Sequence, residues 1–310
     1  MAPWIILVVI GQLMFAVTSL IDKFIVTSKK VSKPFVYAFF VSLLSILSLL
    51  IFALGFIPLD LGGFVFPSIY NIQIPDFKFA LAAVMFGFSF FYSLYYLYSA
   101  LAKADASDVV PVITSLSAVG VFILSTLFLG DTLSTNFLLG FILLVAGTFF
   151  ISHFRFNKEV LILSLLSGIA FSVNITVTKF MFNTTSFDNG FFWSRIGILF
   201  AVIFFLVIPD YIEKLFENTK QSGKSGGLWV IGNSIIGGVA GFMVLKAIEL
   251  GNPTIVQSLA GLQFIFITII SYSVGRLTPV EFGENHNLKD IIQKGIAIVI
   301  MSIGFFFLFI

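Results

Sequence analysis

Hydrophobic positions along the chain fall into long blocks rather than into one-sided stripes. A block of about 20 apolar residues is long enough to cross the roughly 30 Å hydrocarbon core of a bilayer as a helix. We predict ten such spans, five in each half of the chain. They are Pro3–Ile21, Pro34–Phe56, Phe79–Ala102, Val109–Leu129, Leu133–Ser152, Val160–Thr178, Gly190–Ile208, Gly227–Leu245, Pro253–Val274 and Gly295–Ile310.

Charged residues are concentrated between these spans. Arg195 is the single charged residue inside one of them. Only 10% of the residues are charged, whereas soluble domains average about 25%. A charge at bilayer depth costs about 3 kcal/mol on insertion scales, which explains the segregation. The composition excludes a water-soluble surface and predicts an integral, multi-pass membrane protein, which we expect in the cell membrane.

The surrounding lipid restricts the fold class. In lipid each backbone polar group must be satisfied locally, and spans of this length favour helices over short alternating strands. We therefore predict an all-α polytopic membrane protein with ten transmembrane helices. The first span lacks a basic leader and a cleavage site, so we interpret it as a helix and not a signal peptide. The chain has no cysteine, which excludes disulfides and thiolate metal sites.

The two halves of the chain resemble each other. Sliding the sequence along itself pairs Phe15 with Phe171 and Lys23 with Lys179, and a slightly smaller shift pairs Leu101 with Ile248. Repeats with an odd number of spans enter the membrane from opposite sides, as in many secondary transporters. We predict two inverted five-helix repeats, residues 1–152 and 158–310.

A set of small and turn-forming residues closes the first repeat. The motif consists of Ala100-Leu101, Pro111, Leu129-Gly130-Asp131, Gly140 and Gly147. This pattern resembles the EamA family of the drug/metabolite transporter superfamily, which implies a carrier of small metabolites or drugs. The second half departs from it, since its ninth span lacks the proline and Arg276 stands where an acid is usual. The resemblance implies no particular substrate.

The orientation of the chain has two conflicting indications. The loops after the odd-numbered spans hold thirteen of the 17 Lys and Arg residues. By the positive-inside rule those loops are cytoplasmic and both termini external. The resemblance to the EamA family instead implies that both termini lie inside. We follow the charge count and expect both termini to be external.

Polar side chains within the apolar spans are the candidates for substrate binding, because carrier sites lie near the bilayer midplane between the repeats. The candidates are Gln12, Ser19, Tyr92, Tyr96, Thr114, Asn174, Arg195 and Gln257. Each has a structural alternative. The hydroxyl and amide groups can instead tie helices together at about 0.6 kcal/mol each, the tyrosines can pack, and Arg195 can snorkel to the surface.

Three residues are candidates for hinge or gating roles. Pro111 frees a backbone carbonyl, although a tolerated kink is the alternative. Lys246 and Glu249 are spaced for an ion pair that either opens during transport or simply lies on the surface. The predicted spans contain no Asp, Glu or His, so any proton coupling would have to use Asp22, Glu249 or other groups at the rims.

The sequence therefore predicts a secondary carrier and not an enzyme, because it offers no carboxylate–histidine cluster for acid–base chemistry. A translocator of lipids or lipid-linked substrates with the same fold is the main alternative. We expect no metal and no cofactor. The expected partners are a small-molecule substrate and the lipid bilayer, without nucleic acid, and the expected state is a monomer or homodimer.

Overall fold

The computed structural model describes residues 3–28, 31, 33–56, 66–132, 134–152, 157–213, 215, 224–277 and 288–307. The first half contains α1 (Pro3–Thr27), α2 (Pro34–Ser45) continued by the 3-10 helix η1 (Ile46–Phe56), η2 (Ile69–Asn71), α3 (Phe77–Leu101), α4 (Ala106–Leu129) and α5 (Thr135–Ser152). The second half contains α6 (Lys158–Thr184), α7 (Phe187–Val207), α9 (Lys224–Leu250), α10 (Pro253–Ser258), η3 (Leu259–Gly261), α11 (Leu262–Leu277) and α12 (Leu288–Phe307).

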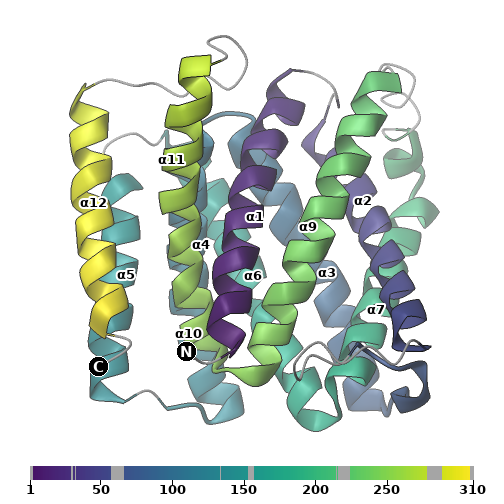
Figure 1. Cartoon of the computed structure of the whole chain (residues 1–310). Coiled ribbons are helices and arrows are strands. Elements are labelled where there is room, and N and C mark those ends of the chain that lie inside the picture. Colours follow the sequence, from purple (N-terminus) through teal and green to yellow (C-terminus); the bar gives the residue numbers. More distant parts are fainter. Residues whose placement is uncertain are drawn as a thin grey trace.

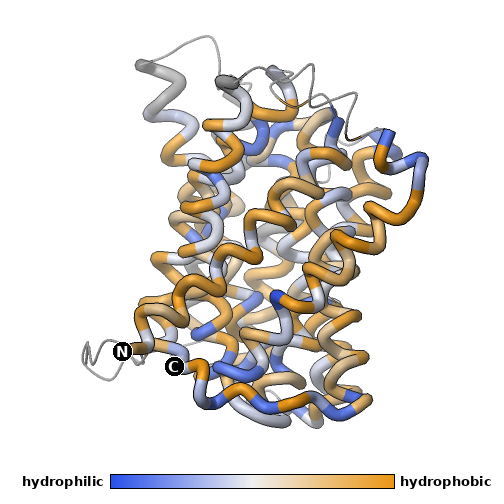
Figure 2. Tube along the Cα trace, turned by 90° about the vertical axis from the view of Figure 1, so that its right-hand side faces the viewer, coloured by the Kyte–Doolittle hydropathy of each residue, from blue (hydrophilic) through white to orange (hydrophobic). Residues whose placement is uncertain are grey.

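The long helices stand side by side as one bundle, and both chain ends lie at the same end of it (Figure 1). Within the described residues, eight segments are long and apolar enough to cross a membrane. Figure 2 shows that hydrophobic residues dominate the middle of the bundle, with hydrophilic segments mainly towards its two ends. The predicted all-α polytopic membrane fold is confirmed. The count of ten crossings stays a prediction, since α5 and α12 are not among those eight.

Short polar side chains begin several of the helices. The Asp76 carboxylate accepts a hydrogen bond from the Phe79 amide at 2.8 Å, and the Asn252 carbonyl oxygen accepts one from the Thr254 amide at 2.9 Å. These side chains satisfy backbone donors that the first helical turn leaves free. At the other end of α4, Gly130 adopts a left-handed conformation with φ 69° that glycine tolerates best.

Helices α1, α6 and α9 continue beyond the apolar runs that predicted them. Asp22 and Lys23 lie inside α1, Lys179 lies inside α6, and Lys246 lies inside α9. The expectation that acidic groups stay out of the spanning helices is therefore wrong for Asp22, which is buried within the first candidate span. Apolar runs mark lipid depth, whereas a helix continues for as long as its polar side chains find partners in the protein.

Glycines allow several helix pairs to approach closely. A Cβ added at Gly87 on α3 would lie 2.0 Å from the carbonyl oxygen of Gly197 on α7, and one at Gly197 would lie 1.8 Å from that of Ala83. Similarly, a Cβ at Gly11 on α1 would meet Val244 on α9 at 2.8 Å. Without an attractive hydrophobic force between helices in lipid, such close packing is a main source of association.

The ninth predicted span, Pro253–Val274, contains a tighter helical turn partway along it. It is divided into α10, the single 3-10 turn η3, and α11. The second span also changes from α2 to the 3-10 helix η1 at Ile46, where Ser45 Oγ donates to the Ser42 carbonyl at 2.7 Å. Interrupted helices at membrane depth are tolerated where they face protein or a cavity.

Candidate functional site

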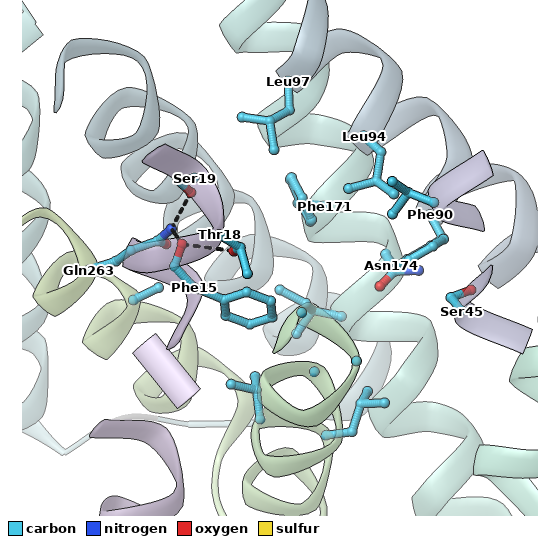
Figure 3. A pocket seen from close by; sticks show the side chains of 18 of the residues that line it. Phe15, Thr18, Ser19, Ser45, Phe90, Leu94, Leu97, Phe171, Asn174 and Gln263 are labelled. Carbon is cyan, nitrogen blue, oxygen red and sulfur yellow. Dashed lines mark hydrogen bonds between the residues drawn. The ribbon is translucent and has the colours of Figure 1, made fainter. Parts of the chain in front are cut away.

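A cavity of about 240 Å³ lies inside the bundle, and we call it the central cavity. Residues from both halves of the chain line it, and Figure 3 shows side chains of α1, α3, α6 and α11 directed towards it. Its polar and charged lining residues are Gln12, Thr18, Ser19, Asp22, Ser45, Ser48, Tyr98, Thr114, Asn174, Thr178, Arg195, Asn233, Ser234, Gln257 and Gln263. A concave space with polar groups in an otherwise apolar bundle is typical of a ligand site.

Most of the predicted substrate-binding residues line the central cavity. These are Gln12, Ser19, Thr114, Asn174, Arg195 and Gln257. Tyr92 and Tyr96 are not part of its lining. Tyr92 is 37% exposed and packs edge-on against Phe205 of α7. Their part in substrate binding stays a prediction.

The amide side chains of the cavity also connect helices. Asn174 Nδ2 of α6 donates to the Phe86 carbonyl of α3 at 3.2 Å, and Gln257 Nε2 of α10 donates to Ser117 Oγ of α4 at 3.1 Å. Gln263 Nε2 of α11 donates to Ser19 Oγ of α1 at 2.8 Å (Figure 3). The same amides therefore tie helices together and line the cavity, because these hydrogen bonds fix where each amide lies.

A buried carboxylate cluster occupies one part of the cavity wall. Asp22 Oδ1 accepts hydrogen bonds from the Tyr37 hydroxyl and, at 2.6 Å, from Asn233 Nδ2. Asn233 Oδ1 has no hydrogen-bond partner among the described residues. Asn233 is not among the residues predicted from the sequence. Its spacing of four from Gly237, and of eight from Gly241, which both face α1, is the signal that could have found it.

Tyr98 belongs to the same region. A tyrosine this close to the end of a span is typical of an aromatic belt at the membrane surface, but its side chain is only 2% exposed. Its ring centroid lies 4.3 Å from that of Tyr37. Helical position near the end of a span does not separate an interfacial tyrosine from one that turns inward, so only packing decides it.

Arg195 is buried in the wall of the central cavity, with 5% of its surface exposed. Its guanidinium carbon lies 4.6 Å from the ring centroid of Phe191 and 6.0 Å from that of Phe86. Its Nε finds no hydrogen-bond partner in the part of the chain that the structure describes. The alternative that Arg195 snorkels to the membrane surface does not hold.

Two lysines make corresponding contacts at opposite ends of the bundle. Lys23 Nζ of α1 donates to the carbonyls of Leu101 and Ala104, at 2.9 and 2.7 Å, where α3 ends. Lys179 Nζ of α6 donates to the carbonyls of Ile248 and Gly251, both at 2.9 Å, where α9 ends. A cation at a helix C-terminus satisfies free carbonyls and the helix dipole. These are the residue pairs that the two halves of the sequence align.

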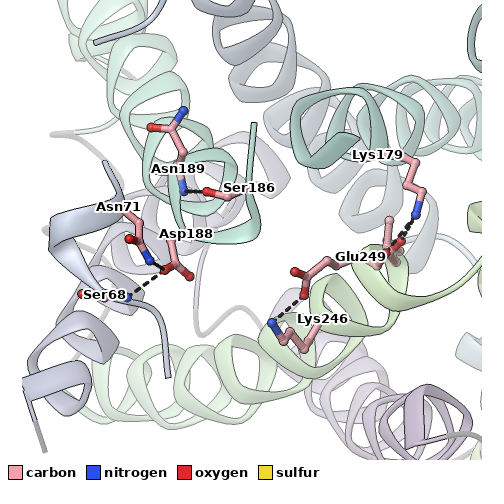
Figure 4. A network of polar contacts seen from close by, with 9 residues as sticks. Ser68, Asn71, Lys179, Ser186, Asp188, Asn189, Lys246 and Glu249 are labelled. Atoms are coloured by element: carbon pink, nitrogen blue, oxygen red, sulfur yellow. Dashed lines mark hydrogen bonds and ion pairs between the residues drawn. The ribbon is translucent and has the colours of Figure 1, made fainter. Parts of the chain in front are cut away.

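The three gating candidates have defined surroundings. Pro111 lies within a continuous α4, and its carbonyl accepts a hydrogen bond from Ser115 Oγ at 2.7 Å. Lys246 and Glu249 form an ion pair at the end of α9 (Figure 4). Lys246 Nζ also lies 4.3 Å from the ring centroid of Phe187. Their gating roles stay predictions.

The same end of the bundle holds two further polar contacts. Asp188 Oδ2, at the start of α7, accepts hydrogen bonds from Asn71 Nδ2 at 2.7 Å and from the Ser68 amide at 3.1 Å (Figure 4). They attach the segment around η2 to α7.

In the turn after α4, burial raises the pKa of the Asp131 carboxyl, and the charge of Lys179 opposes that shift.

Across the described ranges, no group of three or more His, Asp or Glu side chains is placed to hold a metal ion.

Comparison with known proteins finds one matching family and similar solved structures. Residues 2–153 match the family described as the EamA-like transporter family. No curated protein matches the chain. A solved structure titled "Crystal structure of protein" is similar over 97% of this chain and 95% of its own, with a TM-score of 0.64 and 16% identity. At that identity the likeness shows a shared fold alone.

Proposed function

Because the chain belongs, through residues 2–153, to the EamA-like transporter family, we propose that it is a secondary carrier that binds a small molecule in the central cavity. The family is part of the drug/metabolite transporter superfamily. The substrate is held between the two halves near Gln12, Asn174 and Gln257, and the halves move to expose it to either side in turn.

The observation that carries this proposal is the central cavity itself. A membrane bundle gains stability by filling its interior, so an interior space lined by amides, hydroxyls and two charged groups is costly unless it serves a ligand. Its lining comes from α1, α2, α3 and α4 of one half and from α6, α7, α9, α10 and α11 of the other. Relative motion of the halves therefore reshapes the site.

Two inverted repeats, residues 1–152 and 158–310, supply the motion in this proposal. The matching contacts of Lys23 with the end of α3 and of Lys179 with the end of α9 support it. Lys23 connects two helices of the first repeat, and Lys179 connects two helices of the second repeat at the opposite end of the bundle. Because each contact lies within its own half, both can hold while the halves move relative to each other.

The carrier is proposed to work in the cell membrane as a monomer or homodimer. Its partners in this proposal are a small-molecule substrate and the lipid bilayer. The loops after the odd-numbered predicted spans hold thirteen of the 17 Lys and Arg residues. We propose that these loops are cytoplasmic and that both termini are external.

Transport by purified protein in proteoliposomes tests the function. We expect a panel of labelled metabolites, including amino acids, nucleobases, sugars and organic acids, to contain at least one that enters faster than into empty vesicles. Replacing Asn174 by Leu should slow that flux about tenfold, because one hydrogen-bonding group of the cavity is lost. Ser273→Ala, on the exposed side of α11, is the matched control and should leave it unchanged.

Two results would contradict the carrier. One is the absence of flux for every member of the panel, and the other is flux that Asn174→Leu and Ser273→Ala leave equally fast. A parallel assay of labelled-lipid scrambling in the same vesicles separates the lipid translocator from the carrier. Scrambling without uptake of any soluble probe favours the former.

A further inference from the structure

We propose that Arg195 binds an anionic group of the transported molecule, so that the substrate is an organic anion with an apolar body. This inference rests on the proposed carrier function and adds to it the chemical class of the ligand. The charge balance inside the central cavity is the observation from which it starts.

Arg195 carries a buried positive charge that the described part of the protein leaves uncompensated. Arginine stays protonated in proteins, and its side chain offers five N–H donors. Here the side chain is 5% exposed and its Nε has no hydrogen-bond partner. None of the ion pairs found among the described residues involves Arg195. A buried charge of this kind is unfavourable unless an opposite charge and hydrogen-bond acceptors join it.

The aromatic rings beside Arg195 do not replace such a partner. Phe191 and Phe86 attract the guanidinium through their π faces, at 4.6 and 6.0 Å from its central carbon. A ring face stabilises a cation but does not accept the paired N–H hydrogen bonds that a carboxylate or phosphate accepts. The rings therefore hold the guanidinium in place and leave donors available to a ligand.

Asp22, the other charged residue of the cavity lining, is too far along the bundle to neutralise Arg195. Helices α1 and α7 begin at the same end of the bundle (Figure 1). At 1.5 Å per residue, Asp22 lies about 28 Å along α1 and Arg195 about 12 Å along α7. The Asp22 carboxylate also has its own donors in Tyr37 and Asn233. An anion that enters the cavity is the remaining partner.

The surroundings of Arg195 indicate the rest of the ligand. Phe15, Phe86, Phe90 and Phe171 line the same cavity and present apolar surface. Asn174 bonds to the backbone of Phe86, whose ring lies beside the guanidinium, so an amide is positioned near the anion site. The site fits a carboxylate or phosphate attached to an aromatic or aliphatic body. A soluble organic acid and an acidic lipid share this chemistry.

Binding of three indole compounds that differ in one group tests the inference without requiring transport. Indole-3-propionate is anionic, tryptophol is neutral and tryptamine is cationic. We expect the anion to raise the unfolding temperature of the purified full-length protein in detergent, and the other two to have little effect. In Arg195→Met, which keeps the length but removes the charge, the dissociation constant of the anion should rise by about tenfold or more.

Two further variants complete the experiment. Arg195→Lys keeps the charge without the planar fork and should bind the anion with intermediate affinity. Lys103→Met removes a cation from an exposed ion pair with Glu159 and should bind like the wild type. If Arg195→Met does not fold, the preference of the wild type for the anion and the behaviour of Arg195→Lys still decide the question.

The inference is overturned if indole-3-propionate fails to stabilise the wild type, if tryptophol or tryptamine stabilises it equally, or if Arg195→Met binds the anion unchanged. Phosphatidylglycerol added in mixed micelles identifies the source. Competition with indole-3-propionate indicates a lipid headgroup, and its absence indicates a soluble acid. Anion binding without flux in proteoliposomes would count against the carrier alone and leave the anion site intact.

Discussion

At the scale of single residues, the cluster of Asp22, Tyr37 and Asn233 shows how a membrane protein keeps a carboxylate in its interior. Both the Tyr37 hydroxyl and Asn233 Nδ2 donate to the same oxygen, Asp22 Oδ1. The three side chains come from α1, α2 and α9, and so their bonds join both halves of the chain. Removing one donor leaves a buried acceptor less well satisfied, which costs more than the bond itself contributes.

Tyr37→Phe should therefore lower the free energy of unfolding by about 1–3 kcal/mol, since it removes one hydroxyl donor while the ring keeps its contact with Tyr98. Thermal unfolding of the detergent-purified variants, followed by intrinsic fluorescence, measures the change. Tyr92→Phe is the matched control because that tyrosine is 37% exposed, and its effect should stay within about 0.5 kcal/mol. An equal loss of stability in Tyr37→Phe and Tyr92→Phe would show that the Tyr37 hydroxyl adds no stability through its bond to Asp22.

At the scale of helices, packing of backbone against backbone holds α3 to α7. Gly87 and Gly197 face each other there with no room for even one methyl group. In a chain with 41 phenylalanines, contacts of this kind must coexist with bulky aromatic surfaces. The lysine caps work at the same scale, since Lys23 and Lys179 each connect one helix to the end of another.

Gly87→Ala should destabilise the protein by about 1–3 kcal/mol, because the added methyl group forces α3 away from α7. Gly232→Ala provides the control, since the space around that helical glycine is open. There the substitution should be neutral or stabilising by up to about 1 kcal/mol. Thermal unfolding and the monodispersity of each variant in detergent measure both. A tolerated Gly87→Ala would place the helices farther apart than the structure has them.

At the scale of the whole molecule, we expect the distribution of charge to determine the orientation in the membrane. The chain contains no cysteine, so a single introduced thiol reports its own side without background. Ala102, after α3, and Asn183, near the end of α6, are both exposed and lie at opposite ends of the bundle.

With both termini external, Asn183→Cys should react with a membrane-impermeant thiol reagent added to intact cells, whereas Ala102→Cys should react only after the cells are lysed. Gel-shift labelling of each variant measures this. The reverse pattern would show that the termini are cytoplasmic and that the charge count misleads in this chain.

Much of the fold could be predicted from the sequence because the membrane imposes simple rules. Long apolar runs without charge had to be buried in lipid as helices, and the exclusion of charge located the limits of the apolar runs. The repeated Lys23 and Lys179, the aligned Leu101 and Ile248, and the glycine-rich end of the first repeat were visible as local patterns. So were the amides Gln12, Asn174 and Gln257, since a polar group at lipid depth needs a reason.

The tertiary structure alone decided which polar groups meet. Local spacing does not reveal that Asn233 of α9 donates a hydrogen bond to Asp22 of α1. It also does not reveal that Tyr98 turns inward, or that Tyr92 and Tyr96 lie outside the cavity lining. The helices also extend past their apolar runs, because Asp22, Lys23 and Lys179 find partners on neighbouring helices. Hydropathy reports the depth of a residue in the membrane, whereas its direction and partners depend on how the helices pack.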